Sequence, residues 1–231
     1  MAIVVAGASG FVGRALVARL LKEGTAVRAL TRGSGNPWGP VVQAVRWDPA
    51  DAGGAWRSAL EGADAVVNLC GENIAAGRWT AARKKAILES RVESTAALAR
   101  ALPAGGVLVN ASAVGYYGAR GEEVLTESSA PGAGFLADVC KRWEAAAGNA
   151  PAGARVALAR LGVVLGPGGG ALPRMALPFR LFAGGPVGDG RQWMPWVHLD
   201  DAVGALVHLA ATPEAKGPFN VVSPEAARNI D

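Results

Sequence analysis

The sequence predicts an α/β fold, a Rossmann-like doubly wound parallel sheet, on three observations. Short apolar runs alternate with helical patterns, as in βαβ units joined by right-handed crossovers. The runs are rich in Val, Ala and Leu with little polar alternation, which is typical of strands buried on both faces. A glycine-rich turn joins the first run to the first helix, where such folds bind a dinucleotide. We therefore expect one sheet with helices on both faces and a small C-terminal substrate lobe.

The elements follow from their apolar patterns, taken in chain order. Strands are expected at residues 3–6, 26–31, 43–47, 65–69, 107–111 and 155–161, each a short apolar run bounded by polar or turn residues. Helices are expected at residues 12–21, 81–102, 135–148 and 200–211, where apolar residues recur at helical spacing. The third of these helices, "FLADVCKRWEAAAG", has an apolar stripe and so should pack against the sheet.

The chain is expected to divide near Gly162. Residues 1–162 show no repeat or linker and form the predicted cofactor-binding Rossmann domain. Residues 163–231 mix loops, a short apolar helix and a strand-like "FNVV" near the end. This mixed segment is expected to hold the substrate-side lobe.

The charge pattern argues against nucleic-acid binding. The formal net charge is +4, but the basic residues are spread along the chain, and the tightest cluster is Arg83, Lys84 and Lys85. A nucleic-acid-binding protein usually concentrates its charge in a stripe with stacking aromatic residues.

Metal and membrane functions are also not indicated. Two cysteines, Cys70 and Cys140, and two histidines, His198 and His208, show no metal-ligand spacing. No apolar run reaches transmembrane length, and the chain opens on a strand rather than a signal peptide. We expect a cytoplasmic protein that binds a small molecule, with no metal and no membrane segment.

The glycine turn "VVAGASGFVGRAL" carries the most specific functional signal. Gly7 permits the tight turn, Gly10 lets a pyrophosphate approach the backbone, and Gly13 lets the helix and strand pack closely. The alternative is a structural turn without a ligand. The candidate cofactor-binding residues of this turn are Gly7, Ser9, Gly10, Phe11, Val12 and Gly13.

The end of the second strand favours NADP over NAD. An NAD site usually has an acid there for the ribose hydroxyls, whereas this sequence has Thr31 and Arg32. Arg32 can pair with a 2′-phosphate, and Ser34 can donate to it. The alternative is that Arg32 is a solvated turn residue.

Seven motifs in order resemble a known family. They are "GASGFVG", "WDP", "DAVVNLCGENI", "SRVEST", "SAVGYYG", "RLGVVLGPGGG" and "PWVHLDDAV". Together they resemble the atypical extended short-chain dehydrogenases/reductases, in the epimerase-like branch of NAD(P)-dependent epimerases/dehydratases (nucleoside-diphosphate-sugar epimerases). The resemblance covers nearly the whole chain.

The resemblance implies further cofactor-binding residues. Asp48 matches the position that contacts adenine, and Leu69, Cys70 and Gly71 match the loop that lies along the cofactor. Val163 falls near the nicotinamide carboxamide. Arg91 replaces the asparagine of the family's N-V-x-G-T pattern, where it can reach the cofactor phosphates or a substrate diphosphate, or can be surface charge.

The third helix departs from the family's Tyr-x-x-x-Lys pair. Aligning Glu144 with the family's glutamate puts Cys140 in the lysine position and Leu136 in the tyrosine position. Aligning Lys141 with the family's lysine puts Ala137 in the tyrosine position. Neither alignment supplies the phenol that normally exchanges a proton with the substrate.

The remaining proton-transfer candidates are Ser112, Tyr116, Tyr117 and Lys141. Ser112 lies one place away from the family's Ser or Thr, and Tyr117 matches a residue that is usually structural. The third predicted helix, residues 135–148, is therefore expected to form a pocket wall without the usual proton-transfer chemistry.

The loop "GGPVGDGRQWMPWVH" resembles the family's substrate-side loop. It provides Arg191 for a diphosphate and Trp193 as a pocket wall, with plain hydrophobic packing as the alternative. The family continues beyond the final strand, so the resemblance predicts a pocket that is more open here, or one completed by a second subunit in a homodimer.

Three functions agree with these observations. One is an NADP(H)-dependent epimerase, dehydratase or reductase acting on a nucleotide sugar or other hydroxylated substrate. Another is an NADP(H)-binding protein without turnover, such as a redox-cofactor sensor. The last is an interaction scaffold that has kept the fold.

Overall fold

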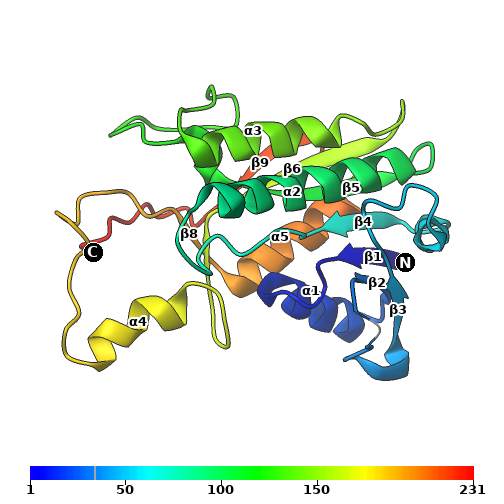
Figure 1. The fold of residues 1–231 in the computed structure, drawn as a ribbon, viewed down its shortest axis with the longest axis horizontal. Coiled ribbons are helices and arrows are strands. Elements are labelled where there is room, and N and C mark those ends of the chain that lie inside the picture. Colours follow the sequence, from blue (N-terminus) through cyan, green and yellow to red (C-terminus); the bar gives the residue numbers. More distant parts are fainter. Residues whose placement is uncertain (34) are drawn as a thin grey trace.

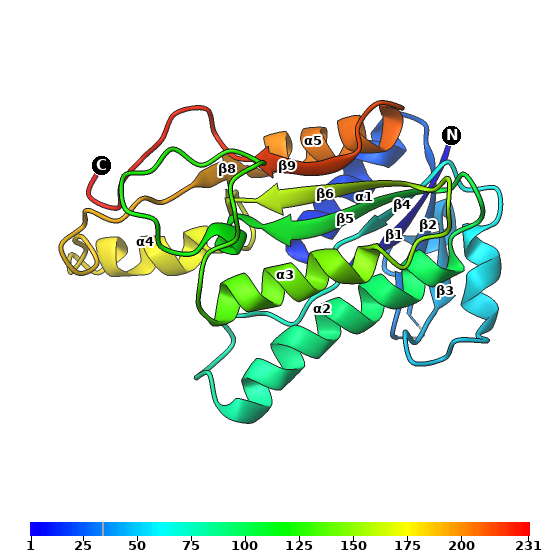
Figure 2. The same cartoon turned by 90° about the horizontal axis from the view of Figure 1, so that it is seen from above.

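A seven-stranded parallel sheet forms the centre of the molecule, in a computed structural model that describes residues 1–33 and 35–231 (Figure 1). The strand order is β3-β2-β1-β4-β5-β6-β9, and every neighbouring pair is parallel. The strands of this sheet are β1 (Ala2–Ala6), β2 (Ala26–Thr31), β3 (Val42–Arg46), β4 (Ala65–Asn68), β5 (Val107–Ala113), β6 (Arg155–Leu161) and β9 (Gly217–Val221). Because all seven run in one direction, their carboxyl ends lie along a single edge (Figure 2).

Helices cover both faces of the sheet. The helices α1 (Phe11–Lys22) and α5 (Leu199–Ala211) pack on one face, and α2 (Ala81–Ala101) and α3 (Phe135–Ala147) pack on the other (Figures 1 and 2). Each face has its own buried core, the first around Leu16, Leu20 and Leu206, the second around Leu98 and Leu108. The predicted doubly wound α/β class is confirmed.

The later part of the chain contributes to both the sheet and the region beyond it. Helix α5 and edge strand β9 complete the sheet, whereas β7 (Val163–Leu165), β8 (Trp196–His198) and α4 (Leu172–Arg180) lie beyond its carboxyl edge (Figure 2). β7 and β8 pair in parallel as a separate two-stranded sheet. The division expected at residue 162 remains a prediction.

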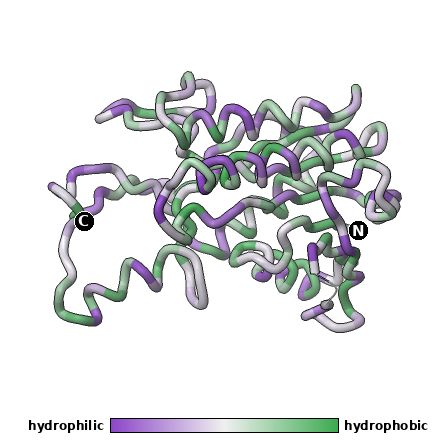
Figure 3. Tube along the Cα trace, in the orientation of Figure 1, coloured by the Kyte–Doolittle hydropathy of each residue, from purple (hydrophilic) through white to green (hydrophobic). Residues whose placement is uncertain are grey.

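Helix α4 lies apart from the sheet and buries none of its residues. Leu177, Phe179, Leu181 and Phe182 are exposed along it and its following turn. Figure 3 shows green hydrophobic positions interrupted by purple hydrophilic ones along this segment, which belongs to neither buried core. Among the described residues, no helix is both long enough and apolar enough to span a membrane.

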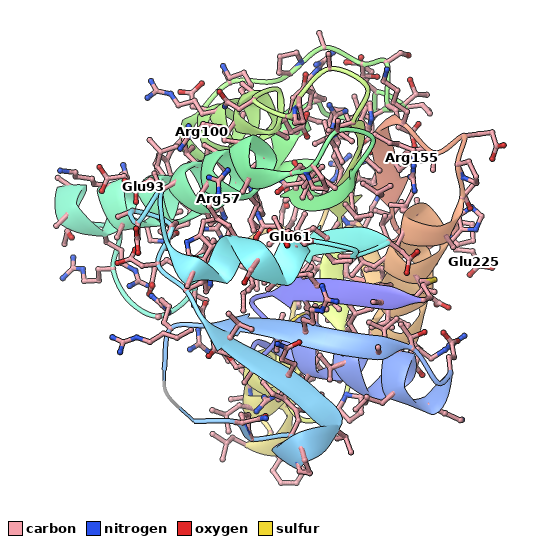
Figure 4. All side chains as sticks on the ribbon, turned by 90° about the vertical axis from the view of Figure 1, so that its right-hand side faces the viewer. Arg57, Glu61, Glu93, Arg100, Arg155 and Glu225 are labelled. Carbon is pink, nitrogen blue, oxygen red and sulfur yellow. The ribbon has the colours of Figure 1, made fainter. Side chains whose placement is uncertain are left out.

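The predicted elements agree with the observed ones to within one or two residues at most ends. The short strands β7 and β8 were not predicted, because three residues are too few to show a periodic pattern. A half-buried arginine fixes α5 to the sheet at the opposite edge: Arg155, labelled in Figure 4, donates to the carbonyls of Leu209 (2.7 Å), Ala210 (2.7 Å) and Ala215 (2.9 Å). The contacts with Leu209 and Ala210 satisfy carbonyls in the last turn of α5, and the contact with Ala215 holds the loop that follows it.

Candidate functional site

The glycine turn is closely packed on two sides. Gly7 has a positive φ of 79°, and a Cβ added to it would lie 2.7 Å from the carbonyl carbon of Leu69. A Cβ on Gly13 would lie 2.3 Å from the Gly7 carbonyl oxygen. Only glycine fits at these two positions, as the spacing predicted, because the helix and the loop after β4 approach the turn so closely.

Gly10, in contrast, leaves space on the outer side of the turn. A Cβ on Gly10 would approach only the Gly7 carbonyl oxygen, at 3.2 Å. The Gly10 amide donates to that oxygen (3.0 Å), and the Gly10 carbonyl accepts the first bond of α1, from Arg14 (2.9 Å). The amides of Phe11, Val12 and Gly13 precede that first bond and have no acceptor within the helix. This open cradle at a helix N-terminus fits a pyrophosphate.

A second glycine-rich loop packs against the same turn. A Cβ on Gly169 or on Gly170 would lie 2.6 Å from the Phe11 ring. The loop that follows β7 therefore lies against the first residue of α1, next to the cradle. The motif comparison gave this "GPGGG" segment no role of its own, although its glycine content is the signal of a close approach.

The end of β2 brings the predicted NADP residues to the same edge. Thr31 donates its hydroxyl to the Gly33 carbonyl (2.9 Å), and Arg32 is exposed. The Asp48 carboxylate accepts from the Ala50 amide (2.9 Å) in a turn after β3 and is also exposed. Ser34 lies outside the described residues.

The loop after β4 continues this edge. The Leu69 amide donates to the Ala6 carbonyl (2.9 Å), and the Cys70 amide donates to the Asn68 side chain (3.1 Å). Burial raises the pKa of the Cys70 thiol to about 12, and the charge of Arg32 opposes this shift. Arg32 therefore lies close enough to act on the β4 loop, across the end of β1.

An ion pair between α3 and β6 organises the other half of the edge. Arg160 donates from Nε and Nη2 to the two carboxylate oxygens of Glu144, at 2.9 Å each. Ser112 donates its hydroxyl to Glu144 (2.6 Å), and Arg160 also donates to the Tyr117 hydroxyl (2.8 Å). The Tyr117 hydroxyl in turn donates to the side chain of Asn220 on β9 (2.7 Å).

Three predicted proton-transfer residues are involved in this network. Ser112 and Tyr117 are 2% and 3% exposed, and both hydroxyl groups are used within it. The Tyr116 ring lies 3.6 Å under the Arg160 guanidinium. Although burial opposes it, the bonds to Glu144 and Tyr117 raise the pKa of Arg160, which therefore remains charged.

Lys141 lies elsewhere on α3. Its ammonium pairs with Asp138 one turn earlier, and both side chains are largely exposed. Lys141 is not among the described residues that line the large cleft at this edge. The sequence patterns assigned no role to Arg160, and Glu144 served only as an alignment point; the available signal was an arginine inside the otherwise apolar end of β6.

A cleft of about 1100 Å³ opens above the network at the carboxyl edge of the sheet. Leu136 and Ala137, the two residues aligned with the family's tyrosine, line it. The substrate candidates Arg191 and Trp193 also line it and are exposed. Arg228 stacks on the Trp193 ring, 4.4 Å from its centre. The wall formed by α3 is thus apolar, as predicted.

Val163 and Arg91 lie at the inner end of the same edge. The Val163 amide donates to the Pro195 carbonyl (2.8 Å), which joins β7 to the loop before β8. Arg91 donates from Nη1 to the carbonyls of Ile87 (2.9 Å) and Glu72 (3.1 Å). Arg91 is therefore held against the β4 loop rather than extended from the helix surface.

The parallel sheet, the glycine turn and the cleft at the carboxyl edge define the class of NAD(P)-binding Rossmann proteins with a substrate cleft. The particular family follows from comparison: the sequence model of the NAD dependent epimerase/dehydratase family matches residues 3–222. The chain belongs to this family, and the resemblance stated from its motifs is confirmed.

Individual relatives are similar over almost the whole chain. Epimerase family protein Mb2239 of Mycobacterium bovis is 42% identical over 99% of this chain and 75% of its own. The crystal structure of human epimerase family protein SDR39U1 (isoform 2) with NADPH is 36% identical, with a TM-score of 0.88 over 99% of this chain and 76% of the human one. MoeE5 in complex with UDP-glucuronic acid and NAD is 25% identical, with a TM-score of 0.76 over 99% and 78%.

The buried ion pair predicts a large stability effect at Glu144. Glu144→Gln leaves the Arg160 guanidinium buried with its charge uncompensated, which should cost about 3–5 kcal/mol of unfolding free energy. Urea unfolding measures this effect. The control Glu89→Gln removes the exposed partner of Lys85 and should cost at most about 1 kcal/mol. Equal stability of the two variants would contradict the assigned role of Glu144.

The raised thiol pKa values predict slow alkylation of the native protein. Burial raises the pKa of Cys140 to about 11, so both Cys70 and Cys140 are protonated at pH 8, where the thiolate is the reactive form. In Cys140→Ser protein, iodoacetamide labelling of Cys70 should keep rising with pH beyond 9.5. The urea-unfolded control should level off near the ordinary thiol pKa of about 8.5. A native profile that levels off at the same pH as the unfolded one would show that Cys70 is unperturbed.

Proposed function

We propose that this protein is an NADP(H)-dependent epimerase, dehydratase or reductase that acts on a nucleotide sugar or another hydroxylated substrate. The observation that carries the proposal is the open cradle at Gly10, on a helix N-terminus, in a chain of the epimerase/dehydratase family. When bound there, the nicotinamide cofactor supplies a hydride acceptor or donor. The chain's own residues hold the cofactor and shape the cleft.

The choice of NADP over NAD rests on the adenosine side of the edge. Arg32 is exposed beside the β4 loop, and no acid follows β2 for the ribose hydroxyls. Its guanidinium is suited to a 2′-phosphate. The human relative with 36% identity is described with NADPH, whereas MoeE5 is described with NAD. Thr31 and Asp48 complete the proposed adenosine side.

The cleft above the Arg160 network is the proposed substrate site. Arg191 and Trp193 lie on its open side, where a guanidinium and an aromatic ring suit a diphosphate and a nucleoside or sugar. MoeE5, described with UDP-glucuronic acid, supports a nucleotide sugar as the class to test first. A homodimer and a cytoplasmic location remain proposals that rest on the sequence.

An NADP(H)-binding protein without turnover is the second candidate, and one observation favours it. Leu136 and Ala137 line the cleft where the family's phenol is expected, and neither can exchange a proton. Ser112 and Tyr117 already donate within the buried network. We therefore expect slow or undetectable turnover of UDP-glucose, with any proton transfer left to Tyr116 or to the substrate. Multiple turnover of UDP-glucose with NADPH or NADP would exclude this second candidate.

The first prediction of the proposal concerns Gly10. Gly10→Val fills the cradle, with its Cβ close only to the Gly7 carbonyl oxygen (3.2 Å), so it should lose about 100-fold or more in NADPH affinity, equivalent to two lost charge-assisted bonds. NADPH fluorescence titration measures this loss. The control Gly204→Val, on α5 with no atom near its added Cβ, should bind as wild type. Tight NADPH binding by folded Gly10→Val protein would place the cofactor elsewhere.

The second prediction concerns selectivity at Arg32. Arg32→Ala removes one charge-assisted contact with the 2′-phosphate and should weaken NADPH binding by about 1.5–3 kcal/mol while leaving NADH affinity unchanged. The measurement is the ratio of the two affinities. Arg100→Ala, an exposed arginine in the last turn of α2, is the matched control. An unaltered NADPH/NADH ratio in Arg32→Ala would remove this residue from the site.

A further inference from the structure

One half-buried arginine stands at the junction of α2, α3 and the β4 loop. Arg91 is carried by α2 and anchored by Nη1, which donates to the Ile87 and Glu72 carbonyls. Its guanidinium lies 5.1 Å from the centre of the Trp143 ring on α3. These three contacts hold the planar group in one place.

The other nitrogens of this guanidinium remain available. No described residue accepts a hydrogen bond from Arg91 Nε or Nη2, and neither belongs to the buried side-chain atoms without a partner. Both nitrogens are therefore reached by solvent. A fixed guanidinium with two free donors is prepared to bind oxygen atoms of a ligand.

Gly71 leaves the space for these two donors. A Cβ on Gly71 would lie 2.9 Å from Arg91 Cζ, 3.1 Å from Nη2 and 3.2 Å from Nε. Gly71 follows β4 at the carboxyl edge of the sheet, three residues past the end of the strand. The absence of a side chain there keeps the free nitrogens at the edge where a cofactor would bind.

The same guanidinium acts on Cys140. Burial raises the pKa of the Cys140 thiol, and the Arg91 charge is among the groups that oppose this shift. Burial also lowers the pKa of Arg91 itself, an effect that Cys140 and Glu72 oppose. When Glu144 is aligned with the family's glutamate, Cys140 takes the lysine position, so in that alignment a cation from α2 lies beside the position where α3 has only a thiol.

The place of Arg91 in the sheet indicates which half of a dinucleotide it faces. The pyrophosphate cradle follows β1, and the adenosine side extends over β2 and β3. The nicotinamide half must then extend the other way, over β4, β5 and β6. Arg91 stands on that side, between the β4 loop and α3.

We propose that Arg91 positions the nicotinamide mononucleotide half of the cofactor, donating from Nε and Nη2 to its ribose or phosphate oxygens. Arg91 thus provides from α2 the cation that α3 lacks at Cys140. This inference rests on the proposed function, since it requires that the glycine turn binds the dinucleotide. Arg91 is a positioning residue in this account, and it transfers no proton.

The test compares two probes that share the adenosine half. NADPH contains both halves, whereas adenosine 2′,5′-bisphosphate contains only the half that lies away from Arg91. Arg91→Gln should weaken NADPH binding roughly 10- to 100-fold and change bisphosphate binding less than about twofold. Reduced nicotinamide riboside and its 5′-phosphate, used as competitors, separate the ribose from the phosphate as the group bound.

Three further variants separate positioning from folding. Gly71→Ala keeps the Arg91 side chain but displaces its guanidinium, since the added Cβ would lie 2.9 Å from Cζ, and it should weaken NADPH binding in the same selective way. Arg91→Lys restores a cation and should recover part of the loss. The control Arg83→Gln removes another α2 arginine that contacts the same segment through Glu72, and it should change neither probe's affinity.

The outcomes differ for the two proposals. If Arg91→Gln loses both probes equally, or loses neither, Arg91 does not recognise the nicotinamide half. If wild-type protein binds the bisphosphate but Arg91→Gln and Gly71→Ala bind NADPH normally, the proposed function stands and this inference is overturned. If wild-type protein binds neither probe, the proposed function fails first, and the inference falls with it.

Discussion

The two hydrogen bonds between Arg160 and Glu144 hold together the half of the molecule in which the cleft lies. They join α3 to β6 in a nearly dry environment, where breaking one partner leaves a buried charge unpaired. Through Ser112, Tyr117 and Asn220, the same pair reaches β5, the turn after it and β9. The floor of the cleft is therefore fixed by a single connected polar network whose members have few donors left for chemistry.

A steric constraint has the same organising effect on the other half. Helix α1 approaches its own turn so closely that Gly13 can carry no side chain, and the β4 loop imposes the same limit on Gly7. Phe11 is covered by the glycine-rich loop after β7, which brings a distant part of the chain to the helix N-terminus. These contacts leave open only the space beside Gly10, which is the proposed cofactor cradle. The same close packing that holds the turn in place therefore also shapes the proposed binding site.

The two halves differ in polarity, and this difference bears on function. The glycine turn presents free amides and Arg32 presents a charge, which suits an anionic cofactor. The α3 wall presents Leu136 and Ala137, which suit exclusion of water but not proton transfer. Arg91 places a cation from α2 beside Cys140, the proposed substitute for the charge of the family's lysine, whereas no residue of the α3 wall substitutes for the phenol. Binding of a cofactor is thus better supported by the structure than acid–base chemistry.

The sequence by itself determined the features that depend on local pattern. Strand and helix periodicity gave the α/β class, the glycine spacing located the proposed phosphate cradle, and the motifs identified the family, because each signal lies within a short stretch of chain. Only the tertiary structure decided the roles of side chains whose partners are distant in sequence. Ser112 and Tyr117 are used in a buried network because Glu144 and Arg160 meet them there, and Lys141 faces away because α3 presents its apolar stripe to the sheet. Arg91 has a specific environment because Gly71, far from it along the chain, lacks the side chain that would occupy the same space.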